Sequence, residues 1–216
     1  LDILQNLALK FSNVEIYQNK KKIGSVKAYS IGLKLAQSEF IYFAAADDET
    51  FPYLFEMAVD HLKKFPKAAF ACAEAILLDL ETNKLSKRPI IRPKIRSSYM
   101  NPNSVETEFR SNDNWIMTGS TIFRTALVKN VGGFETGLYS YADSFLARKL
   151  AFRYGCIFFK YYGVKWYINR RGYSNTVISN HQKIRNIKEN IYKLMERDTN
   201  FPLWYRDKLL ERINFS

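Results

Sequence analysis

Short apolar runs and helical patterns alternate along the first third of the chain. The run over residues 40–46 is apolar throughout and ends in three acids, Asp47, Asp48 and Glu49. Such a run, bounded by polar residues, is typical of a strand buried on both faces of a sheet. A second apolar run covers residues 68–78, with helical spacing between the two. The alternation predicts an α/β fold in which helices flank a mostly parallel sheet.

The periodicity also gives bounds for each expected element. On the helix over residues 25–37, the inward face is expected to hold Ala28, Ile31, Leu35 and Ala36. Residues 80–114 have no periodicity and predict a long irregular segment. The expected helices span residues 1–11, 25–37, 52–65, 125–130, 143–154, 181–198 and 201–215. The expected strands span residues 14–17, 40–46, 68–78, 115–124, 157–159 and 164–168.

The last part of the chain differs from the rest. Residues 181–216 carry many basic side chains, with apolar residues at helical spacing between them. We therefore expect one α/β domain over residues 1–180 and a helical C-terminal extension over residues 181–216.

Charge narrows the class of partner. The formal net charge is +12, from 33 Lys and Arg against 21 Asp and Glu, which favours anionic partners. The sequence has only two cysteines, so a reducing compartment is expected. No apolar run approaches the ~20 residues that span a bilayer, and Leu1 to Leu4 do not resemble a signal peptide. We expect a cytoplasmic protein, with peripheral attachment to the inner membrane face as an option.

The three acids are the first candidate for chemistry. Burying carboxylates is costly, so Asp47 and Asp48 are expected to emerge at the carboxyl end of their strand, where α/β sheets bind ligands. Adjacent carboxylates can share a divalent cation, which in turn can hold a diphosphate. The alternative, of equal weight on local sequence, is a solvated acidic turn before a helix that Pro52 opens.

Two further elements follow the acids along the chain. Gly119 and Ser120 lie in a strand-like run, and Gly132-Gly133-Phe134-Glu135 precedes Asp143 at the start of a helix. In this order and spacing, the acid-ended strand and the later elements resemble the family-2 nucleotide-sugar glycosyltransferases over residues 1–180. The resemblance implies the GT-A fold, which is Rossmann-like.

The resemblance also implies roles for the acids. Asp47 and Asp48 are expected to bind Mn²⁺ or Mg²⁺, which neutralises the charge of the leaving nucleoside diphosphate. Asp143 is expected to be the base that takes a proton from the acceptor hydroxyl. The implied reaction is a direct displacement with inversion and without a covalent enzyme intermediate. Which of Asp47 and Asp48 binds the metal stays open.

Four more residues are candidates for substrate binding. Gly119 and Ser120 are expected to line the donor or acceptor sugar, and Arg170 and Arg171 to pair with the diphosphate. A plain core strand explains the first two nearly as well, and two exposed loop arginines are equally common. Asp143 itself is also a good helix cap, but the Gly-Gly-Phe-Glu element before it favours the base.

Some features depart from the family pattern. Ala45 stands where many members have Asp, and Ser30 where Asn is common. The Gln-x-x-Arg-Trp signature of processive synthases is missing, so a single transfer is expected. The first strand and nucleobase-binding element of the family are expected before Leu1, and without them the nucleotide pocket is incomplete.

The expected partners follow from the implied reaction. They are a nucleotide sugar, with a UDP-sugar as first choice, and a glycan or lipid-linked acceptor in surface polysaccharide synthesis. The basic C-terminal helices could rest on an anionic membrane surface, or be a solvated outer face. No nucleic acid is expected, although a basic nucleic-acid-binding domain and a catalytically inactive transferase-like scaffold are the alternatives. The enzymatic interpretation requires that Asp47 and Asp48 converge with Asp143 across one cleft.

Overall fold

The computed structural model of the chain describes residues 2–169 and 172–214. Its elements, in chain order, are α1 (Asp2–Lys10), α2 (Ser25–Leu35), β1 (Phe40–Tyr42), β2 (Glu49–Thr50), α3 (Tyr53–Lys64), β3 (Phe70–Asp79), β4 (Leu85–Arg88), β5 (Tyr99–Met100), α4 (Pro102–Ser111), η1 (Thr118–Ser120), β6 (Thr121–Arg124), α5 (Thr125–Asn130), η2 (Thr136–Tyr141), α6 (Ala142–Tyr154), β7 (Cys156–Ile168), α7 (Tyr173–Ile178), α8 (His181–Arg197) and α9 (Leu203–Asn214).

The described strands form one mixed sheet in the order β1-β6-β3-β7-β2, with β4 on β3 and β5 on β7. Strands β3 and β7 pair in parallel, whereas every other pair is antiparallel. The expectation of a mostly parallel sheet is therefore wrong. Strands β1, β3 and β7 do run in one direction, but β6 lies antiparallel between β1 and β3. The short β2, β4 and β5 have no clear sequence signal.

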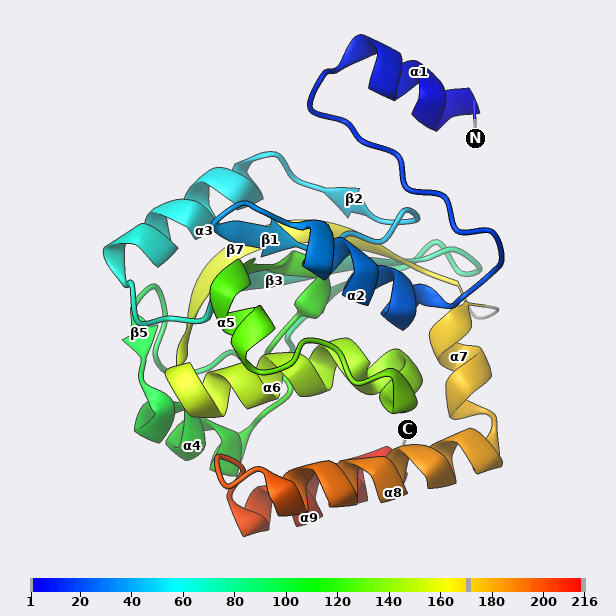
Figure 1. The fold of residues 1–216 in the computed structure, drawn as a ribbon. Helices are drawn as coiled ribbons and strands as arrows, with labels where there is room; N and C mark the ends of the chain where they lie inside the picture. Colours follow the sequence, from blue (N-terminus) through cyan, green and yellow to red (C-terminus); the bar gives the residue numbers. More distant parts are fainter. Residues whose placement is uncertain (1, 170–171, 215–216) are drawn as a thin grey trace.

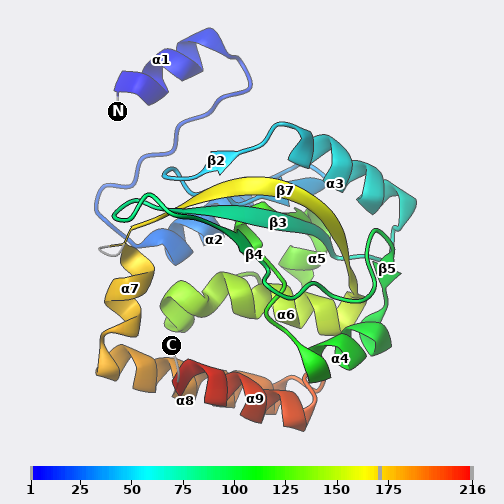
Figure 2. The same cartoon turned by 180° about the vertical axis from the view of Figure 1, so that it is seen from behind.

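Side chains of β3 alternate between two cores, which explains why its first four residues, Phe70 to Ala73, are all apolar. Phe70 and Cys72 belong to the larger core, and Ala71 and Ala73 to the smaller one. Helix α3 covers the smaller core with Leu54, Ala58 and Leu62, whereas α6, α8 and α9 lie on the other side of the sheet. The two views agree on this layering (Figures 1 and 2). The protein is thus a sheet flanked by helices, as predicted.

Several expected elements need correction. Residues 14–17 form no strand, and the irregular segment expected at 80–114 contains β4, β5 and α4. Asn101 caps α4 by accepting a hydrogen bond from Ser104 N at 2.9 Å, and a proline follows it, which are helix signals that the periodicity did not reveal.

The strand after α2 is shorter and less buried than expected. It is β1, at one end of the strand order, and its three residues are only half-buried. Helix α2 buries Val26 and Leu33, whereas Ile31 and Leu35 are exposed, so the expected inward face is wrong. Helix α1 lies away from the body of the molecule, and none of its residues is buried (Figure 1).

The C-terminal helices pack on the larger core. Their buried residues include Ile187 and Ile191 of α8 and Leu209 of α9, at the spacing that the sequence predicts, and also Tyr205. Within the described residues, no helix is both long and apolar enough to cross a bilayer.

Candidate active site

The acid segment, residues 44–49, connects the two ends of the strand order. It leaves β1 at one end and enters β2 at the other, so it crosses the end of the sheet. Asp47 is exposed, whereas Asp48 is half-buried and accepts a hydrogen bond from Tyr167 N at 3.1 Å. Glu49 accepts one from the Tyr167 hydroxyl at 3.0 Å and lies 3.6 Å from Lys165 Nζ. The neighbouring strand β7 therefore holds this segment in place.

Asp143 lies in the first turn of α6. Its Oδ2 accepts a hydrogen bond from Thr118 Oγ1 at 2.6 Å, and its Oδ1 accepts one from Ser144 N at 2.7 Å. The preceding Gly132 and Gly133 have φ angles of 88° and 72°, which glycine adopts without strain. A Cβ on Gly133 would lie 2.8 Å from Leu33 Cδ2, so this turn packs closely on α2.

Three aromatic rings bring the acid segment and the start of α6 together. Tyr29 of α2 packs on Phe43, which follows β1, at 5.5 Å between ring centroids, and on Phe134 at 5.6 Å. Phe43 and Phe134 are themselves 4.7 Å apart in an edge-to-face arrangement. Segments that are far apart in the sequence are thus joined directly behind the carboxylates.

The Tyr29 hydroxyl lies at the start of the acid segment, 3.4 Å from Ala44 O. Burial raises the pKa of Tyr29, and the negative charges of Asp143, Asp47 and Asp48 raise it further. One hydroxyl therefore lies within electrostatic reach of all three carboxylates. Tyr29 is not among the residues that the sequence singles out, because its contact with Phe134, near Asp143, depends on packing across the whole domain.

The other predicted residues fall in different environments. Ser120 is fully buried, and its hydroxyl donates to Ala73 O at 2.6 Å. Gly119 accepts a hydrogen bond from the Tyr42 hydroxyl at 2.7 Å. Arg170 and Arg171 lie outside the described residues. The structure thus places Ser120 within the fold, whereas Gly119 adjoins Thr118, the partner of Asp143.

Asp47 and Asp48 are chemically suited to a hard cation. Their carboxylate oxygens are the ligands that Mn²⁺ and Mg²⁺ prefer, and these metals keep water or phosphate oxygens as further ligands. Asp48 uses one oxygen for Tyr167 N and has the other available. Between residues 2 and 214, apart from Arg170 and Arg171, no cluster of three or more His, Cys, Asp or Glu side chains could hold a metal alone.

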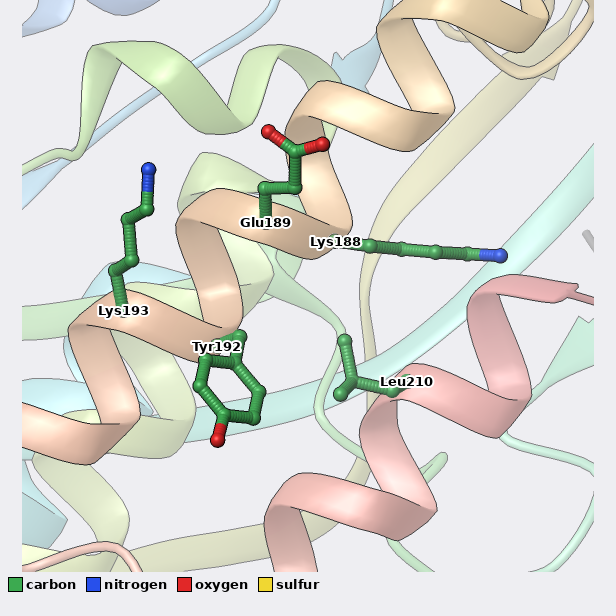
Figure 3. A pocket seen from close by; sticks show the side chains of 5 residues that line it. All are labelled: Lys188, Glu189, Tyr192, Lys193 and Leu210. Atoms are coloured by element: carbon green, nitrogen blue, oxygen red, sulfur yellow. The ribbon is translucent and has the colours of Figure 1, made fainter.

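Two surface hollows lie apart from the candidate acids. One, of about 540 Å³, is lined by Lys188, Glu189, Tyr192 and Lys193 of α8 and by Leu210 of α9 (Figure 3). The other, of about 780 Å³, lies between the end of α2 and the start of α5. Neither is lined by Asp47, Asp48 or Asp143.

Comparison with protein families gives one match. The family described as "Glycosyl transferase family 2" matches residues 1–127, which include the acid segment and end before Asp143. None of the curated proteins compared matches the chain.

Solved structures are similar in fold. S. aureus TarS 1-349 in complex with UDP has a TM-score of 0.62 and 14% identity, covering 98% of this chain and 56% of TarS 1-349. The same protein with UDP-GlcNAc has a TM-score of 0.61 and 14% identity, covering 97% and 58%. Mannosyltransferase PcManGT from Pyrobaculum calidifontis, with GDP-Man and Mn²⁺, has a TM-score of 0.58 and 16% identity, covering 99% and 55%. The chain therefore spans just over half the length of these structures.

Proposed function

The chain belongs to glycosyl transferase family 2, whose enzymes transfer a sugar from a nucleotide sugar, and from this premise we propose an inverting, non-processive transfer. The proposed acceptor is a glycan or lipid-linked glycan of a surface polysaccharide, and the proposed donor is a UDP-sugar. The UDP and UDP-GlcNAc bound to TarS support this choice of donor, while GDP-Man bound to PcManGT makes GDP-sugars the alternative.

In the proposed reaction, the acceptor oxygen forms a bond to the anomeric carbon of the donor sugar. The bond from that carbon to the diphosphate oxygen breaks, and its electron pair leaves with the nucleoside diphosphate. The acceptor proton passes to the carboxylate of Asp143, which accounts for ~10²–10⁴-fold of the rate. Attack and departure take place on opposite sides of the carbon, so its configuration inverts.

The acid segment has the complementary task. Asp47 and Asp48 are the residues that would hold Mn²⁺ or Mg²⁺, and such a cation neutralises the charge that develops on the leaving diphosphate. Asp143 serves the opposite side of the sugar. The observation that carries this division of roles is the contact of Tyr29 with both segments: its hydroxyl lies 3.4 Å from Ala44 O of the acid segment, and its ring lies 5.6 Å from that of Phe134, which precedes α6.

A thermal-shift panel tests the proposal. UDP, GDP, UDP-GlcNAc and GDP-Man are each added with and without Mn²⁺, because a ligand that binds only the folded state raises Tm. We expect Mn²⁺-dependent stabilisation by the UDP compounds, which the D47N/D48N double variant loses. D60N, at an exposed position of α3, is the matched control and should keep it. Equal stabilisation of the double variant would contradict the metal-binding role.

The domain boundary and the membrane contact are further parts of the proposal. We place a transferase domain at residues 1–180 and a helical extension at residues 181–216, whose apolar side packs on the larger core. Packing of this side leaves an outward face that is net basic: on α8, Arg185, Lys193 and Arg197 are exposed against Glu189 and Glu196. Lys183 is half-buried, with its ammonium over the Tyr139 ring. The outward face could attract anionic lipid at ~1 kcal/mol per basic residue near the surface.

Vesicle binding separates the lipid contact from a solvated face. In co-sedimentation with phosphatidylserine-containing vesicles, the R185E/K193E/R197E variant should lose binding. K20E/K21E/K22E changes the net charge equally, in an exposed segment between α1 and α2, and should retain it. Equal binding by both variants would remove the proposed lipid contact.

A further inference from the structure

Hydrogen bonds connect the acid segment to the residues around Asp143. The Tyr42 hydroxyl donates to Gly119 O at 2.7 Å and lies 2.9 Å from Thr50 Oγ1. The preceding residue of η1, Thr118, donates from its hydroxyl to Asp143 Oδ2 at 2.6 Å. Strands β1 and β2, η1 and α6 are therefore joined between Thr50, which follows the acids, and the candidate base.

The direction of each bond follows from the chemistry of the groups. A phenol has one proton, and a carbonyl oxygen can only accept, so the Tyr42 proton goes to Gly119 O. The Thr50 hydroxyl must then donate to the Tyr42 oxygen. A carboxylate likewise only accepts, so Thr118 donates to Asp143, and hydrogen bonds to an ionised acceptor are the stronger kind.

The turn η1 lies in the middle of this series of hydrogen bonds and is held by further hydrogen bonds of its own. The Ser120 hydroxyl donates to Ala73 O at 2.6 Å, which fixes η1 to β3, and Thr121 Oγ1 donates to Met117 O at 2.7 Å, which closes the turn across its two flanking residues. The Tyr42 ring packs edge to face on Phe55 at 5.4 Å. A hydroxyl on so constrained a turn can fix the orientation of a carboxylate in a way that water cannot.

We propose that Thr118 and Tyr42 are positioning residues that hold the Asp143 carboxylate and the acid segment in a fixed relation. Thr118 acts on the base directly, and Tyr42 acts through η1 and Thr50. Thr118 and Ser144 N occupy one lone pair on each carboxylate oxygen, which leaves the other pairs for the acceptor proton. The inference rests on the proposed role of Asp143 as the base.

Steady-state kinetics test the inference. The reaction followed is release of UDP from UDP-GlcNAc with Mn²⁺, with water as acceptor. We expect T118V to lower kcat by ~10–100-fold, since displacement of a reacting group by ~1 Å can cost ~10²-fold, while the donor KM stays within about twofold. T118S keeps the hydroxyl and should restore most of kcat, and Y42F should lower kcat by less than T118V.

Matched controls lie outside the site. T107V removes an exposed hydroxyl that donates to Asn103 O at 3.0 Å, and Y99F removes a phenol that donates to Tyr154 O at 2.8 Å. Both should turn over at the wild-type rate. If T118V behaves like T107V while D143N is inactive, the positioning role is overturned and the base is retained. If D143N turns over normally, the proposed base itself fails.

A thermal double-mutant cycle tests the same bond without turnover. Tm is measured for T118V, D143A and the double variant, because asparagine at position 143 would keep an oxygen that accepts from Thr118. If the bond forms, the two Tm shifts are not additive, because each single variant already removes it. Additive shifts would overturn the inference even for a chain that does not hydrolyse UDP-GlcNAc.

Discussion

Two aspartates, Asp113 and Asp48, lie in opposite electrostatic environments. Asp113 is 5% exposed, accepts hydrogen bonds from the Tyr205 hydroxyl at 2.7 Å and Arg212 Nη1 at 2.8 Å, and lies 3.5 Å from Arg148 Nε. Among the described residues, Asp48 has one hydrogen-bond donor, the backbone N–H of Tyr167, and another acid lies beside it in the sequence. Buried charge is compensated at the first site and left uncompensated at the second.

Their pKa values move in opposite directions as a result. Burial alone would raise the pKa of Asp113, but the charges of Arg148 and Arg212 outweigh it and the pKa is lowered. At Asp48 burial raises the pKa, Tyr167 N–H opposes the rise in part, and Asp47 adds to it, so the pKa is raised.

The difference indicates which acids serve folding and which are available for ligands. Among the described residues, no Lys or Arg lies within 4.0 Å of the carboxylate oxygens of Asp47, Asp48 or Asp143. Acids without cationic partners can accept a metal ion or a proton, at some cost in stability. Four substitutions test this contrast.

D143N should have the largest effect. Asn cannot accept the acceptor proton as a base, so turnover should fall by ~10²–10⁴-fold. Stabilisation by nucleotide and Mn²⁺, measured by thermal shift, should be unchanged, because Asp143 serves the other side of the sugar. A parallel loss of nucleotide binding would show that Asp143 belongs to the donor site instead.

D113N should have the next largest effect, on folding. Removing one partner of a buried pair leaves Arg148, which is 2% exposed, without its counter-charge, at about 3–5 kcal/mol of unfolding free energy. Urea denaturation measures this change. D207N removes the acid of an exposed pair with Arg206 and should change stability by less than about 1 kcal/mol. Similar losses from both would contradict the contrast between buried and exposed acids.

Asp113 should also make stability depend on acid pH. Because its pKa is lower in the folded state, its contribution is complete above the ordinary aspartate pKa of about 3.9 and is lost as pH falls through the lower folded value. Unfolding free energy measured between about pH 2 and 7 should therefore fall more steeply below about pH 4 in the wild type than in D113N. Parallel curves would argue against an ionised Asp113 as the source.

D48N should have the smallest effect, with the opposite sign. A carboxyl whose pKa is raised by folding stabilises the protein at low pH and loses that contribution as pH rises through the folded value. At pH 7 its ionised form is unfavourable, so D48N should raise Tm slightly. The gain in unfolding free energy should be less than about 1 kcal/mol, because water screens a half-exposed group. The increase should disappear when Mn²⁺ is present. A lowered Tm would contradict it.

Local patterns were sufficient to predict much of the fold. Helix α6 buries Phe145, Leu146, Leu150 and Phe152 as its spacing predicts, and Gly155 ends it with a φ of 73°. Strand direction could not be predicted, because it depends on which distant partner pairs with each strand. Strand β6 gives an ordinary apolar signal, but only its neighbours β1 and β3 make it antiparallel.

The candidate acids could be predicted because they interrupt apolar and glycine-rich patterns. Their surroundings could not. Thr118 lies in the expected strand over residues 115–124, but its role requires Asp143 to lie beside it, 25 residues further along the chain. The hydrogen bonds from Tyr205 and Arg212 to Asp113 require α9 to fold back on the segment after α4. Contacts of this kind depend on tertiary packing, which a local sequence pattern does not encode.

The position of β7 has a consequence for how the chain folds during synthesis. Both β2, which follows the acids, and β3, at the centre of the sheet, pair with β7 at residues 156–168. Closing such long loops has an entropic cost and slows folding. A nascent chain that has emerged only as far as α6 therefore carries the acids on an unanchored segment and exposes the β3 edge, so we expect it to be a chaperone client until β7 arrives.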